Sequence, residues 1–71
     1  MGIDYTAVDG CILSSIRSGR PTFPMMVDDR NLAHWCKQIQ FKDWENVIDR
    51  RLQSLKRKGV IRYTNGMWLI L

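Results

Sequence analysis

The apolar pattern of the chain changes its period at Gly59, and this change limits the possible folds more than any other feature. Before Gly59, apolar residues recur three and four apart over residues 44–58, which is the spacing of a helix with one buried face. After Gly59, two β-rich runs flank Asn65-Gly66. Asn-Gly strongly favours a hairpin, because both central residues of a type I′ turn need positive φ. The sequence therefore predicts a helix that ends at Gly59 and a C-terminal hairpin.

The hairpin is expected to pair residues 60–64 with residues 67–71. In this register four large apolar side chains would share one face and close over the helices: Ile61, Tyr63, Trp68 and Ile70. Leu69 and Leu71 would point the other way and leave an apolar surface on the outside of the hairpin.

The first predicted helix runs from about Tyr5 to Ser18, because apolar residues recur there at helical spacing. Asp4 is placed to cap its first turn. Gly19 suits the left-handed conformation that often ends a helix.

The second predicted helix begins after Asp28, as its N-cap, and runs to Ile39. Val27 and Leu32 occupy the two positions of a hydrophobic staple across such a cap. Asp43 is placed to cap the third helix in the same way.

Residues 20–26 connect the first two helices and contain Pro21 and Pro24. Two prolines so close together disfavour a helix interior, so we expect an extended connection, with a short extra strand at 21–25. Three apolar side chains of this segment are expected to cover the core: Phe23, Met25 and Met26. The predicted fold class is therefore α+β, a single domain over residues 1–71 with three helices and a two-stranded C-terminal hairpin.

Charge is distributed unevenly along the chain, which has a formal net charge of +4. The first 49 residues contain all seven acids and five bases, whereas the residues from 50 onward contain six bases and no acid. Such an asymmetry indicates a polyanionic partner, with nucleic acid as the first candidate. The alternative is a basic surface that is only solvated.

The segment RRLQSLKRKGVI, residues 50–61, joins the third helix to the hairpin. Its leucines pack the helix onto the core, Gly59 lets the chain reverse, and Ile61 returns to the core. This junction resembles the one between recognition helix and wing in the winged helix-turn-helix family, especially its small bacterial and phage transcription regulators. The resemblance covers almost the whole chain. It implies that the third helix enters the major groove of double-stranded DNA while the hairpin, as the wing, touches the neighbouring backbone.

Two sets of residues are predicted to contact DNA. The first is the polar outer face of the third helix, which can read base edges: Asn46, Arg50, Gln53 and Arg57, with Ser54 at its margin. The second set can bind phosphate without reading sequence: Lys56, Lys58 and Arg62. Any amphipathic helix has a polar outer face, however, and this simpler explanation stays open. Arg51 lies nearer the core stripe, so an ion pair with an acid and a DNA contact are equally open for it.

A second function is a winged-helix module that binds another protein. Acidic residues near the starts of the second and third helices favour it, because family members approach phosphate there: Asp28, Asp29, Asp43, Glu45 and Asp49. Exposure of apolar side chains would favour it as well: Phe23, Met25, Met26, Leu69 and Leu71. A homodimer is a further candidate arrangement, since two-fold symmetry matches palindromic DNA half-sites.

Other functions have little support. The single histidine, His34, supplies no set of nucleophile, base and orienting group, so we expect no enzymatic activity. His34, Cys36 and Cys11 give at most three soft ligands without the paired spacing of a zinc site, so no metal or small-molecule cofactor is expected. The cysteines are expected to be buried free thiols. The longest apolar run, 67–71, is far below the roughly 18 residues of a membrane span, and no signal peptide is visible, so we expect a cytoplasmic protein without a membrane partner.

Overall fold

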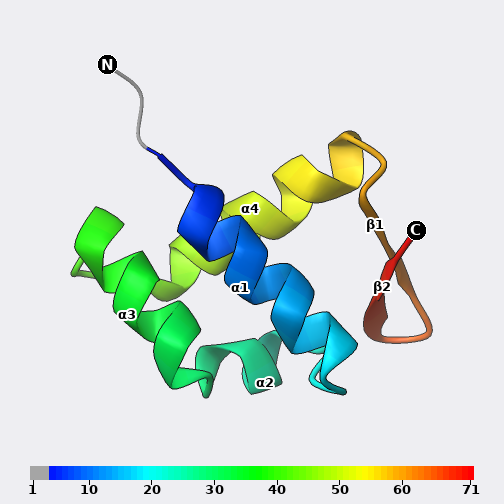
Figure 1. The fold of residues 1–71 in the computed structure, drawn as a ribbon, viewed down its shortest axis with the longest axis horizontal. Coiled ribbons are helices and arrows are strands. Elements are labelled where there is room, and N and C mark those ends of the chain that lie inside the picture. The colour runs from blue at the N-terminus through cyan, green and yellow to red at the C-terminus, as the bar shows by residue number, and fades with distance from the viewer. Residues whose placement is uncertain (1–3) are drawn as a thin grey trace.

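A computed structural model describes residues 4–71 of the chain (Figure 1). The elements in chain order are α1 (Thr6–Arg17), α2 (Phe23–Val27), α3 (Arg30–Ile39), α4 (Glu45–Arg57), β1 (Ile61–Thr64) and β2 (Met67–Ile70). The described residues thus form an α+β fold of four helices and a C-terminal antiparallel hairpin. The first three residues of the predicted domain 1–71 lie outside the described residues.

The core lies where α1 crosses α4, with α3 on one side and the hairpin on the other (Figure 1). Helix α1 contacts α3, α4 and β2, while α4 also contacts α2 and β1. Every element supplies at least one of the buried apolar side chains: Val8, Ile12, Met26, Leu32, Cys36, Val47, Ile48, Leu52, Leu55, Ile61 and Trp68. Burial of the apolar stripe of α4 is therefore confirmed. The prediction that Ile61 lies in the core is confirmed as well.

Helix α1 is one residue shorter at each end than predicted, and its N-cap is Tyr5, which forms no side-chain cap bond. Asp4, one residue earlier, still bonds to the first turn as expected. The Thr6 backbone N–H donates to Asp4 Oδ1 at 2.9 Å, and so the carboxylate satisfies a free donor of the first turn. Gly19 lies in the left-handed region at φ +87°. Helix α1 ends with Ser18 as its C-cap, and the Ser15 hydroxyl donates to the Arg20 carbonyl at 3.1 Å.

The short strand predicted at 21–25 is wrong, because Phe23–Val27 forms helix α2. Pro24 is tolerated there since it lies in the first turn, where a helix uses no backbone N–H. Only Pro21 bonds to the sheet: its carbonyl accepts from the Trp68 N–H at 2.8 Å. Met26 is fully buried as expected, but Phe23 and Met25 are 36% and 45% exposed and cover the core only in part.

The predicted cap of α3 is wrong by one residue. Asp28 has helical dihedrals and serves as the C-cap of α2, so it cannot begin α3. Asp29 is extended (φ −75°, ψ 115°), and its Oδ1 accepts from the N–H groups of Asn31 at 3.0 Å and Leu32 at 3.3 Å. The hydrophobic staple predicted between Val27 and Leu32 is therefore wrong as well. With the N-cap at Asp29, the two residues no longer occupy the positions of a staple.

The cap predicted for the following helix is also wrong. Asp43 has a positive φ of +54°, and the N-cap of α4 is Trp44, which forms no side-chain cap bond. The Asp43 carbonyl, not its carboxylate, accepts from the Asn46 N–H at 3.0 Å. The left-handed conformation places Asp43 in the turn before the helix and leaves its carboxylate exposed.

The adjacent acids Asp28 and Asp29 allow a matched test of the α3 cap. Asp29→Ala is expected to lower the free energy of unfolding by about 1 kcal/mol, because two backbone N–H groups lose their acceptor. Asp28→Ala removes the same charge next to it and is expected to change stability by less than about 0.5 kcal/mol. Urea denaturation followed by circular dichroism measures both variants. Equal losses would show that charge, and not the cap, is responsible.

The hairpin has the predicted register, with Tyr63 opposite Trp68 and Ile61 opposite Ile70. Asn65 and Gly66 have positive φ values of +50° and +79°, as a type I′ turn requires. Ile61 and Trp68 are buried, but the prediction that Tyr63 closes over the core is wrong, because it is 54% exposed. The indole of Trp68 occupies the core position, and the Tyr63 ring packs edge-on against it at 5.0 Å.

Candidate nucleic-acid interface

The predicted base-reading residues share one side of α4. Asn46, Arg50 and Arg57 are exposed, while Gln53 and Ser54 are half-buried. The five residues lie on this side because the core stripe occupies the opposite face of the same helix. The structure thus brings the polar side chains of the predicted set onto one accessible surface.

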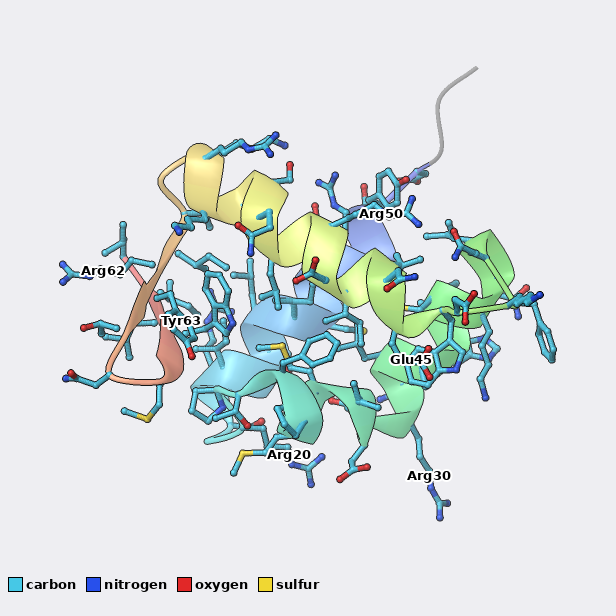
Figure 2. The ribbon with its side chains drawn as sticks, turned by 180° about the vertical axis from the view of Figure 1, so that it is seen from behind. Arg20, Arg30, Glu45, Arg50, Arg62 and Tyr63 are labelled. Carbon is cyan, nitrogen blue, oxygen red and sulfur yellow. The ribbon has the colours of Figure 1, made fainter. Side chains whose placement is uncertain are left out.

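The predicted phosphate-binding residues lie at the junction of α4 and the hairpin. Lys56 lies in the last turn of α4, Lys58 is its C-cap, and Arg62 lies in β1; all three are exposed. Helix α4 contacts β1, and Figure 2 shows this junction at one end of the molecule. Figure 2 shows Arg62 at this end and Arg50 on the upper side of α4, whereas Arg20 and Arg30 lie along the lower edge of the molecule.

Acidic side chains are confined to one part of this surface. Asp43, Glu45 and Asp49 lie in the turn before α4 and in its first half, and no acid follows residue 49. Asp49 is exposed beside the predicted base-reading face, so the electrostatic potential there is mixed. The C-terminal half of α4 and the hairpin are the strongly basic part of the surface.

Arg51 forms the ion pair that was one of the two possibilities left by the sequence. Its Nε and Nη2 donate to the two carboxylate oxygens of Asp9, both at 2.8 Å, and join α4 to α1. The guanidinium also lies over the Tyr5 ring, 4.3 Å from its centroid. The hydrogen bonds to Asp9 favour the charged form and raise the pKa of Arg51 above its ordinary value.

The remaining bases of this region are exposed: Arg50, Lys56, Arg57, Lys58 and Arg62. Among residues 4–71, only Arg50 of these five has a side-chain hydrogen-bond partner: its Nη2 donates to Gln40 Oε1 at 2.9 Å. Gln40 belongs to the short turn before α4, and sequence reasoning gave it no role. No local pattern signals this contact, because the two residues meet only after α3 and α4 have packed.

The thiols and the histidine form no reactive cluster. Burial raises the pKa of Cys36 to about 11 and, less strongly, that of Cys11, so both remain protonated near neutral pH. Both cysteines are free, although Cys11 is only half-buried. His34 is exposed and lies edge-on to Trp35 at 5.2 Å. Within residues 4–71, no three His, Cys, Asp or Glu side chains gather in a way that could hold a metal ion.

Comparison of the chain with family models, curated proteins and solved structures found no match. None of the helices in the described part of the chain has the length and apolar character needed to cross a membrane.

Proposed function

We propose that this chain is a winged helix-turn-helix protein that binds double-stranded DNA and acts as a small transcriptional regulator. The observation that carries the proposal is the group of five exposed bases on α4 and the hairpin, in a part of the chain without any acid. A duplex presents a dense array of phosphate charges to such a surface.

Helix α4 is the element proposed to enter the major groove. Its 13 residues give a rod about 20 Å long, and the groove is wide enough to admit one helix. Asn46, Arg50 and Gln53 carry the donor and acceptor groups that recognise adenine and guanine edges. Arg62 in β1 would then face the phosphates beside the groove, as the wing of this fold does.

The acids on α4 give the proposed complex an orientation. Asp43, Glu45 and Asp49 lie on or before the first half of the helix, and phosphate repels them. The C-terminal half of α4 is therefore proposed to lie closest to the DNA backbone, with the first half in contact with base edges or water.

Salt dependence of binding to a random-sequence duplex tests the proposal. With about four phosphate contacts, affinity should fall roughly 100-fold between about 50 and 200 mM salt, because each contact releases counterions. Fluorescence anisotropy of a labelled duplex measures this fall. The double variant Arg50→Ala/Arg57→Ala is expected to bind at least about tenfold more weakly at 50 mM salt.

A matched control separates location from net charge. Arg20→Ala/Arg30→Ala removes the same two charges from the edge of the molecule opposite Arg50 (Figure 2). This variant is expected to keep its affinity within about threefold, because only long-range attraction is lost. Equal losses in the two double variants, or no binding of the wild-type protein at 50 mM salt, would contradict the proposal.

A protein-interaction module is the second candidate, and the outside of the hairpin favours it. Met67 and Leu69 alternate along β2, Leu71 directly follows the strand, and the three side chains are 41%, 39% and 67% exposed. Failure of duplex binding, together with capture of a protein by the wild-type chain but not by Leu69→Ser, would favour this function over DNA binding.

A further inference from the structure

Gln40 joins the turn before α4 to the outer face of that helix. It is the C-cap of α3, half-buried and extended (φ −149°, ψ 106°). Its Nε2 donates to the carbonyls of Lys42 at 2.9 Å and Asp43 at 3.2 Å. Its Oε1 accepts from Arg50 Nη2 at 2.9 Å. A single side-chain amide thus closes the turn and holds the guanidinium ten positions later in the chain.

The three hydrogen bonds fix which way the amide of Gln40 faces. An amide nitrogen can donate but cannot accept, and here it lies within hydrogen-bond distance of two carbonyl oxygens. The opposite orientation would place the amide oxygen against two carbonyl oxygens and the amide nitrogen against a cation. Gln40 can therefore offer only its acceptor to Arg50.

Arg50 keeps most of its hydrogen-bonding capacity in this arrangement. A guanidinium has five N–H donors, and the bond to Gln40 uses one of them. The others can still form the pair of parallel bonds with guanine O6 and N7. A held arginine also loses less side-chain entropy on binding than a freely rotating one. Among residues 4–71, no side-chain hydrogen bond holds Arg57, Lys56, Lys58 or Arg62 in this way.

We propose that Gln40 is a positioning residue that presents Arg50 to a guanine, so that the DNA sites preferred by this protein carry a guanine where Arg50 meets the major groove. This inference rests on the proposed function. It separates Arg50, which reads a guanine, from Lys56, Lys58 and Arg62, which supply affinity for phosphate.

The experiment compares site preference with general affinity. Sites are selected from a random duplex library with the wild-type protein, and binding is then measured to a selected site and to a random duplex. The preference is the ratio of the affinities for the selected site and the random duplex. Gln40→Ala is expected to reduce this ratio about tenfold, while its affinity for the random duplex stays within twofold of the wild-type value. Gln38→Ala removes the same type of side chain from the exposed surface of α3, and it should keep both the site preference and the affinity for the random duplex.

Two further arms keep the test decisive. Arg50→Lys retains the charge but not the planar fork, so it should lose the preference as Gln40→Ala does, even if that variant folds poorly. Replacing the selected guanine with 7-deazaguanine removes the N7 acceptor. This change should lower the affinity of the wild-type protein for the site about tenfold, but that of Gln40→Ala by less than twofold.

The outcomes separate the two proposals. If the wild-type protein binds and selects sites but Gln40→Ala selects them equally well, the positioning role is overturned while the DNA-binding function stands. Selected sites without a common guanine would also overturn the positioning role and leave the DNA-binding function standing. If the wild-type protein binds no duplex at low salt, both proposals are overturned.

Discussion

Trp68→Ala is expected to lower the free energy of unfolding by about 4 kcal/mol. The indole is only 6% exposed and closes the core between the hairpin and the helices. Alanine would leave a large cavity that a two-stranded hairpin cannot fill by moving. A chain of 71 residues has a total stability of about 4–10 kcal/mol, so a substantial fraction of the variant should be unfolded at 37 °C. Thermal and urea denaturation followed by circular dichroism measure the loss.

The cross-strand partner of Trp68 supplies the control. Tyr63 lies opposite Trp68 in the same sheet but is 54% exposed. Tyr63→Ala removes the edge-on aromatic contact and little buried area, so a loss of about 1 kcal/mol is expected. If both variants lost the same free energy, the hairpin would be held by the aromatic pair and not by burial of the indole.

The second large effect is expected from the ion pair between α1 and α4. Arg51→Ala should lower the free energy of unfolding by about 2 kcal/mol, because two short charge-assisted hydrogen bonds to Asp9 are lost. The pair is only partly exposed, with side-chain exposures of 15% and 21%, so water replaces these bonds incompletely. A double-mutant cycle with Asp9→Ala measures the coupling, which is expected at about 1–2 kcal/mol. Additive losses would mean that the two side chains stabilise the fold independently.

Arg50 and Arg51 are adjacent but are expected to behave differently. Arg50→Ala should change stability by less than about 1 kcal/mol, since its bond to Gln40 is exposed, yet it should weaken duplex binding. Arg51→Ala should lower stability but leave the duplex affinity of the folded protein nearly unchanged, once the fraction of folded protein is taken into account. If Arg50→Ala destabilised the fold and Arg51→Ala mainly weakened duplex binding, the roles assigned to the two residues would be exchanged.

The parts of the fold that were predictable from sequence are those governed by local periodicity and turn chemistry. The stripe of α4, the helix end at Gly19 and the hairpin register around Asn65-Gly66 all depend on residues close together in the chain. Helix α2 was missed because proline excludes a helix interior but not a first turn. The α3 cap was assigned to Asp28 because two adjacent acids carry the same local signal, and only the backbone of Asp29 is extended.

The candidate site divides in the same way. Its outer-face residues followed from the helical period, and the structure confirms that Asn46, Arg50 and Arg57 are exposed. The partners of the arginines did not follow from the sequence: Asp9 lies 42 positions from Arg51, and Gln40 lies ten from Arg50. Such contacts depend on how the helices pack, which no local pattern encodes.

The two faces of α4 have a consequence for how a protein of this design can evolve. Val47, Ile48, Leu52 and Leu55 fill the core, so exchange at these positions is restricted. Asn46 and Arg57 contribute little to the core, and exposed positions of this kind usually tolerate substitution with small changes in stability. Mutations there can accumulate and be tested by selection one at a time, while the folded state persists. Descendants of one ancestral chain can in this way diverge in what they recognise and remain superimposable in structure.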